Sequence, residues 1–110
     1  MSENNLNIKN LFDLNGKIAV VTGGASGLGL TISKTLVENG CKTLYIFSRK
    51  EDQLKKTKEL LLNINSKVNV NYLPIDLSNK SGCDKVVNFI KERESNIDIL
   101  VNNSGVSNKL

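Results

Sequence analysis

The sequence has 110 residues, of which 39% are hydrophobic and 24% are charged, so it fits one compact globular domain. No apolar run approaches the length of a membrane-spanning helix, which argues against a membrane protein. The net charge of +4 comes without a basic stripe and with only 5% aromatic residues, which argues against nucleic-acid binding. There is no histidine, so Ser-His-Asp and Cys-His pairs are excluded and we expect no metal site.

We divide the chain into a polar leader, residues 1–14, and one domain, residues 15–110. The leader has no long apolar segment and no arginine, so it resembles neither a secretory signal nor a transit peptide. Cys41 and Cys83 are far apart and belong to no Cys-x-x-Cys motif, which favours reduced thiols. Together these features predict a cytoplasmic location.

Strand and helix patterns alternate along the rest of the chain. Short apolar or β-branched runs predict strands, and apolar residues at helical spacing, such as Leu28, Ile32 and Leu36, predict helices. The segment 81–84 resembles a capping box that begins the third helix. This alternation predicts a parallel sheet with right-handed crossovers. The predicted strands are 17–22, 43–48, 68–75 and 97–101, and the predicted helices are 28–39, 51–64 and 81–94.

A glycine-rich turn, residues 22–29, joins the first predicted strand to the first predicted helix. Gly23 permits the tight turn, Gly27 leaves room for a pyrophosphate beside the backbone, and Gly29 lets the helix lie close to the sheet. The helix N-terminus adds free N–H groups and the positive end of its dipole. No Gly-Lys-Ser/Thr follows, which excludes a P-loop. The turn therefore predicts a dinucleotide site.

Three motifs resemble those of the classical short-chain dehydrogenases/reductases. They are Thr-Gly-x-x-x-Gly-x-Gly at 22–29, an aspartate and an apolar residue at 76–77, and Asn-Asn-Ser-Gly at 102–105, where Ser104 replaces the family's usual alanine. The resemblance runs from about Leu14 to the C-terminus. It implies an α/β fold with a Rossmann-type doubly wound parallel sheet in the order 3-2-1-4, truncated after the fourth strand. It also implies an oxidoreductase that interconverts a carbonyl and an alcohol by hydride transfer.

The resemblance also implies which residues contact the cofactor. Ser26 and the backbone around Leu28 would contact the pyrophosphate. Asp76 would bind the adenine amino group, and Leu77 would pack on the adenine ring. Asn102 would tie the central strands together, although a turn role for Asp76 and a strand-end cap at 102–103 are the ordinary alternatives. The adenosine side would be lined by Asn103, Ser104 and Gly105.

The end of the second strand distinguishes the two nicotinamide cofactors. In Rossmann folds an acidic residue here binds the ribose 2′-hydroxyl of NAD, whereas an arginine suits the 2′-phosphate of NADP. This strand ends in Ser48, Arg49 and Lys50, and the first carboxylates follow in the next helix. Arg49 offers a planar donor fork and Ser48 a hydroxyl, so we predict NADP(H) in preference to NAD(H). The alternative is that Arg49 is only a solvated residue before a helix.

The catalytic residues that the resemblance implies are not found in this sequence. The family places a serine after the fifth strand and a Tyr-x-x-x-Lys in the next helix. Here Tyr45 is followed four positions later by Arg49, and Tyr72 by Asp76. We therefore expect no catalytic residue in this chain and doubt its activity in isolation.

Three hypotheses follow for the function. The favoured one is the cofactor-binding portion of an NADP-dependent oxidoreductase, whose full-length form would take a small carbonyl or alcohol substrate and form a homo-oligomer. The alternatives are a non-catalytic module that binds a dinucleotide or pairs with another subunit, and a non-functional truncated product. The apolar fourth strand, 97–101, is expected at the sheet edge, where it would promote self-association.

Overall fold

The computed structural model describes residues 13–103. Its four strands form one parallel sheet in the order β3-β2-β1-β4. The predicted α/β Rossmann-type sheet and its strand order are therefore confirmed, and the predicted elements differ from the observed ones only near their ends. The elements are β1 (Ile18–Thr22), α2 (Gly27–Glu38), β2 (Thr43–Ser48), α3 (Glu51–Ile64), β3 (Asn69–Pro74), α4 (Lys80–Lys91) and β4 (Ile99–Asn102).

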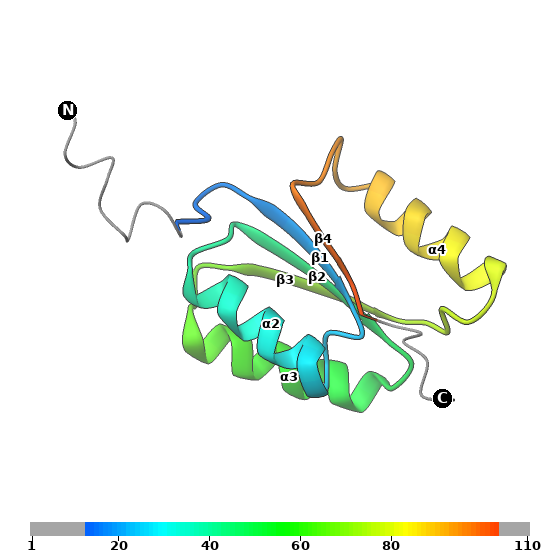
Figure 1. Cartoon of the computed structure of the whole chain (residues 1–110), viewed down its shortest axis with the longest axis horizontal. Coiled ribbons are helices and arrows are strands. Elements are labelled where there is room, and N and C mark those ends of the chain that lie inside the picture. Colours follow the sequence, from blue (N-terminus) through cyan, green and yellow to red (C-terminus); the bar gives the residue numbers. More distant parts are fainter. Residues whose placement is uncertain (1–12, 104–110) are drawn as a thin grey trace.

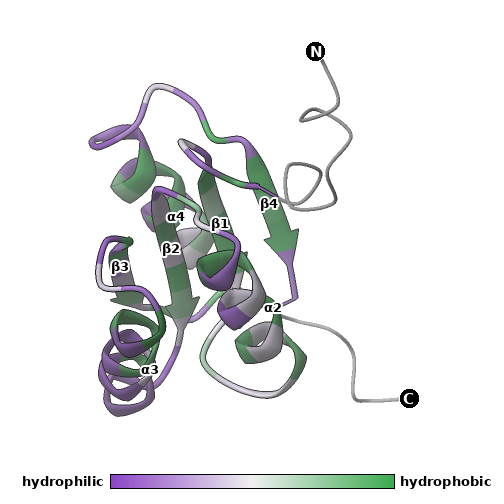
Figure 2. Ribbon diagram, turned by 90° about the vertical axis from the view of Figure 1, so that its left-hand side faces the viewer, coloured by the Kyte–Doolittle hydropathy of each residue, from purple (hydrophilic) through white to green (hydrophobic). Residues whose placement is uncertain are grey.

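The sheet separates two layers of helices (Figure 1). Helices α2 and α3 cover one face, and α4 alone covers the other. Successive side chains of a strand point to opposite faces, so β1 and β2 must be apolar throughout to bury both. Figure 2 shows both strands as hydrophobic along most of their length. No helix within residues 13–103 is long and apolar enough to cross a membrane.

The two faces have separate cores. The α2 and α3 side includes Val21, Ile46, Leu54 and Leu61, which are fully buried. The α4 side is built on Val20, Tyr45, Phe47 and Val86. The first core is the larger because two helices contribute to it. The second core has only one helix, so its packing depends on the position of α4.

The start of α4 differs from the prediction. The capping box proposed for residues 81–84 is wrong, because the N-cap of α4 is Asn79, two residues before Ser81, and the helix begins at Lys80. The Asn79 side-chain oxygen accepts a hydrogen bond of 2.7 Å from the backbone N–H of Gly82. Asparagine and serine are equally good N-cap residues, so residue type alone does not distinguish Asn79 from Ser81 as the N-cap.

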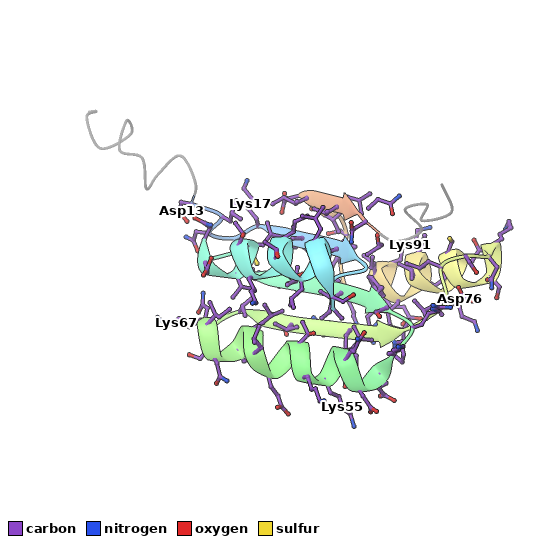
Figure 3. All side chains as sticks on the ribbon, turned by 60° about the horizontal axis from the view of Figure 1, so that its bottom comes forward. Asp13, Lys17, Lys55, Lys67, Asp76 and Lys91 are labelled. Carbon is purple, nitrogen blue, oxygen red and sulfur yellow. The ribbon has the colours of Figure 1, made fainter. Side chains whose placement is uncertain are left out.

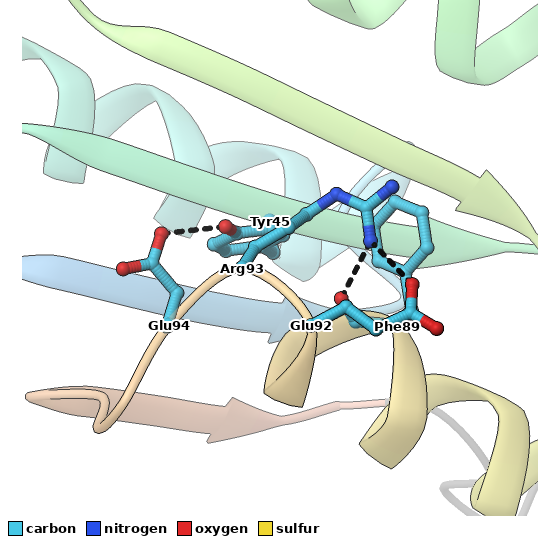
Figure 4. A network of polar contacts seen from close by, with 5 residues as sticks. All are labelled: Tyr45, Phe89, Glu92, Arg93 and Glu94. Carbon is cyan, nitrogen blue, oxygen red and sulfur yellow. Dashed lines mark hydrogen bonds and ion pairs between the residues drawn. The ribbon is translucent and has the colours of Figure 1, made fainter.

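The C-terminal end of α4 is attached to β2 by a polar and aromatic cluster (Figure 4). The buried hydroxyl of Tyr45 donates a 2.6 Å hydrogen bond to the Glu94 carboxylate. The ring of Phe89 meets those of Tyr45 and Phe47 edge to face, and the guanidinium of Arg93 lies 3.8 Å from the Phe89 ring centre. Burial raises the pKa of Tyr45 to about 12, and Glu94 acts in the same direction.

Replacing Tyr45 tests this attachment. We expect Tyr45→Phe to lower the free energy of unfolding by about 1 to 2 kcal/mol, because Glu94 loses its partner. The folded-state pKa lies above the ordinary value of 10.0, so the stabilisation is complete below pH 10 and is lost as the pH rises toward 12. Urea unfolding from pH 8 to 11.5 should therefore show the two proteins converging at high pH. Tyr72→Phe, at a partly exposed position on β3, is the control; a constant difference across this range would contradict the assignment.

The two edges of the sheet differ in polarity. The β3 edge carries Asn69, Asn71 and Pro74, which discourage pairing with another strand. The β4 edge has the sequence Ile-Leu-Val-Asn, and the side chain of Leu100 is 62% exposed. An exposed apolar edge strand favours pairing with another strand, so self-association through β4 remains our prediction.

We expect Leu100→Lys to reduce self-association of the 110-residue chain, because a charge on an edge strand opposes strand pairing. Sedimentation velocity at several concentrations measures the change. Val87→Lys is the matched control, since Val87 is also exposed but lies on α4. A wild-type chain that is already a monodisperse monomer with a cooperative melt would refute this expectation.

Candidate cofactor-binding site

The N-terminus of α2 is exposed in the part of the chain that the structure describes. Ser26, Gly27 and Leu28 are exposed, and among the described residues the Ser26 hydroxyl makes no capping hydrogen bond. The first N–H groups of a helix have no partner within it, so they and this hydroxyl can donate to an anion. Gly27 has a φ of 55°, and a Cβ there would meet no described atom within 4 Å. Within residues 13–103, no neighbouring atom therefore blocks the approach of an anion to the backbone at Gly27.

The remaining glycines of the turn hold α2 against the end of β1. Gly23 has a φ of 68°, as a tight turn out of the strand requires. A Cβ on Gly29 would collide with the carbonyl oxygen of Gly23, so only glycine permits this approach. The close packing that the sequence predicts for Gly29 is thus observed.

Ser33 is a supporting residue that the sequence analysis missed. Its fully buried hydroxyl donates to the carbonyl oxygens of Gly29, at 2.9 Å, and of Gly24, at 3.3 Å. It thereby ties the second turn of α2 to the glycine turn. The four-residue spacing of Gly29, Ser33 and Val37 places these three small residues on one helix face, but this spacing alone does not identify the partners of the Ser33 hydroxyl.

The ends of β1 and β4 are joined by side chains. The Thr22 hydroxyl donates to the Asn102 side-chain oxygen at 3.0 Å and accepts from the backbone N–H of Asn103 at 2.9 Å. The Asn103 side chain reaches the carbonyl oxygen of Gly23 at 3.5 Å. Asn102 therefore ties β1 to β4, in line with its predicted role of joining strands, and Asn103 lies beside the glycine turn. Ser104 and Gly105 lie outside the described residues.

The end of β2 belongs to the same edge of the sheet. The N–H of Gly23 donates to the carbonyl oxygen of Phe47 at 2.8 Å, which places the glycine turn beside the last residues of β2. Ser48 is partly buried there, and Arg49 is exposed. The N–H of Ile75 donates to the Ser48 carbonyl oxygen at 2.7 Å, so the loops after β2 and β3 also lie side by side.

A hollow of about 390 Å³ lies beyond these strand ends. Arg49 and Asp76 line it together with the first turns of α4. Figure 3 shows Asp76 where β3 ends and α4 approaches. Hydrogen bonds from Ser78, including one of 2.9 Å from its backbone N–H, lower the pKa of Asp76, and the charge of Arg49 adds to this effect. Asp76 is therefore an ionised acceptor that also stabilises its own turn.

Two leucines that are predicted to contact the cofactor, Leu28 and Leu77, differ in burial. The sequence places Leu28 in the apolar stripe of α2, but its side chain is 65% exposed, because the buried face of the helix runs through Gly29, Ser33 and Val37. Its backbone remains at the helix N-terminus, where the pyrophosphate contact was predicted. Leu77 is partly buried and packs against the core on the α4 side.

Comparison with known proteins identifies the family. The family model described as short chain dehydrogenase matches residues 17–110, so the chain belongs to the short-chain dehydrogenases/reductases. It is 40% identical over 99 residues to the short-chain dehydrogenase/reductase PhomF of Diaporthe leptostromiformis, covering 88% of this chain and 32% of that protein. It is 35% identical over 102 residues to the dehydrogenase/reductase SDR family protein 7-like of Anopheles gambiae, covering 90% of this chain and 32% of that one.

Solved structures agree with this assignment. The L-sorbose reductase of Gluconobacter frateurii, complexed with NADPH and L-sorbose, has a TM-score of 0.80 at 32% identity, over 90% of this chain and 37% of that one. The Pseudomonas aeruginosa RhlG/NADP active-site complex has a TM-score of 0.76 at 34% identity, over 87% and 37% of the two chains. The chain spans about a third of the length of the curated relatives it matches.

Replacing Gly29 tests the close approach of α2. We expect Gly29→Ala to lower the free energy of unfolding by about 1 to 3 kcal/mol, the usual cost of overpacking, because the helix must move away from Gly23. Urea unfolding measures this loss. Gly27→Ala is the matched control: it meets no neighbouring atom and carries only the cost of a positive φ, about 1 to 2 kcal/mol. A Gly29→Ala protein as stable as the wild type would refute the packing role.

Proposed function

We propose that this chain is the NADP(H)-binding portion of an oxidoreductase that interconverts a carbonyl and an alcohol by hydride transfer. The observation that carries the proposal is the open N-terminus of α2, in front of Gly27, beside the joined ends of β1, β2 and β4. Family membership supports the reaction class. The NADP and NADPH named for two solved relatives support the cofactor class.

The residues present suit a dinucleotide. The backbone N–H groups around Leu28 and the hydroxyl of Ser26 would bind the pyrophosphate, aided by the positive end of the helix dipole. Asp76 is ionised and would accept from the adenine amino group, while Leu77 would contact the ring. When bound, NADP(H) would supply or accept the hydride. The adenosine side would be lined by Asn103, Ser104 and Gly105, of which the last two lie outside the described residues.

Arg49 carries the proposed preference for NADP(H). Its guanidinium is exposed at the end of β2 and lines the hollow, and its charge reaches the carboxylate of Asp76. An adenosine 2′-phosphate is a stronger anion than one carboxylate and would draw the guanidinium toward itself. Ser48, one residue earlier, would add a hydroxyl donor. An NAD-binding site would need an acidic residue here, and the sequence places none at 48–50.

The rest of the proposal concerns the whole protein. We place catalysis outside this chain, since its sequence contains no Tyr-x-x-x-Lys. The substrate would be a small carbonyl or alcohol compound, of the kind that L-sorbose represents for one solved relative. We also propose a homo-oligomer and a cytoplasmic location.

Binding of the two reduced cofactors tests the proposal. We expect the 110-residue chain to bind NADPH more tightly than NADH by fluorescence titration. Arg49→Gln should weaken NADPH binding about tenfold and leave NADH binding unchanged, because only NADPH presents a phosphate to the guanidinium. Lys50→Gln is the matched control, since Lys50 is a neighbouring exposed cation that does not line the hollow. Tighter binding of NADH by the wild type would overturn the preference.

A further inference from the structure

The hollow at the end of β3 has two walls, which come from different parts of the chain. One wall comes from the loops after β2 and β3, with Arg49 and Asp76. The other comes from α4, where Ser81 and Lys85 both line the hollow. These two residues are four positions apart, so they lie on one helix face. The adjacent face of α4 is buried through Gly82 and Val86, which fixes the direction in which Lys85 projects.

The rotation of α4 is held at its other end. Phe89 lies four residues beyond Lys85, and its ring packs edge to face against Tyr45 and Phe47 of β2. Glu94 accepts the hydrogen bond from Tyr45 shortly after the helix ends. Because the helix cannot turn freely, Ser81 and Lys85 stay directed at the hollow.

The charges around the hollow favour an anion. Arg49 and Lys85 contribute two positive charges, and Asp76 contributes one negative charge that is engaged by Ser78. The ion pairs found within residues 13–103 are Lys80–Asp84 and Arg93–Glu92, so neither Arg49 nor Lys85 is neutralised by one. The N-terminal end of α4 adds a positive dipole end, and the Ser81 hydroxyl adds a donor at the same wall.

We propose that Lys85 is a second determinant of cofactor specificity, which holds the adenosine 2′-phosphate from the α4 side while Arg49 holds it from the β2 side. This inference rests on the proposed function. A phosphate monoester carries up to two negative charges at neutral pH, which two cations match better than one. The hollow, about 390 Å³, also falls within the range of small-ligand sites, so it has room for more than an inorganic ion.

Binding of nucleotide fragments to the 110-residue chain tests the inference. We expect isothermal titration to show that Lys85→Gln weakens binding of 2′,5′-ADP about five- to tenfold, the effect of one exposed charge on a phosphate, without changing that of 5′-AMP. Lys85→Arg should keep most of the affinity because it keeps the charge. Lys91→Gln is the matched control, since Lys91 is an exposed cation in the last turn of the same helix (Figure 3).

The outcomes separate the two proposals. If Arg49→Gln weakens 2′,5′-ADP binding and Lys85→Gln does not, the role of Lys85 is wrong and the proposed function stands. If the wild type binds 5′-AMP as tightly as 2′,5′-ADP, or binds neither, the proposed cofactor preference fails and the inference fails with it. If inorganic phosphate competes as well as 2′,5′-ADP, and only when Lys85 is present, the hollow is a free-phosphate site and the inference is wrong. Lys85 is exposed, so circular dichroism melts of all variants should match.

Discussion

The contact between the start of α2 and the carbonyl group of Gly23 controls the whole cofactor-binding edge. The helix reaches this carbonyl only because Gly29 has no side chain. The Asn103 side chain reaches the same carbonyl oxygen, and the Gly23 N–H binds the end of β2 at Phe47. The backbone N–H and C=O groups of Gly23 thus join the ends of β1, β2 and β4 to the N-terminus of α2. The donors proposed for the pyrophosphate therefore have a fixed position relative to the residues proposed for the adenosine.

The other face of the sheet contributes through a single helix. Helix α4 has no helical neighbour on its face among residues 13–103, so its position depends on its contacts with β2 and on its N-cap (Figure 1). The aromatic contacts of Phe89 and the Tyr45–Glu94 hydrogen bond fix its rotation. That rotation in turn decides which α4 side chains face the hollow. The packing of Phe89 and Glu94 against Tyr45 therefore also sets the direction of Lys85, the proposed specificity residue.

The sheet could be predicted from the sequence because strands buried on both faces are apolar throughout, and the glycine turn could be predicted because its spacing follows from backbone geometry. Other features depend on tertiary placement. Leu28 repeats at helical spacing, but the buried face of α2 runs through Gly29, Ser33 and Val37, one residue further along, so the Leu28 side chain is exposed. Ser33 is polar at a buried position, and only the two carbonyl oxygens it binds explain it. Tyr45 and Glu94 are 49 residues apart, so no local pattern connects them.

The hydrogen bond between Thr22 and Asn102 joins residues 80 positions apart in the sequence. A parallel pair with this separation closes a large loop, which slows folding. On the ribosome the glycine turn emerges well before β4, so the wall that Asn103 forms is missing while the intervening residues are made. A dinucleotide that needs this wall could bind only after β1 and β4 have paired. The cofactor would then stabilise chains in which β1 and β4 have paired over chains in which they have not.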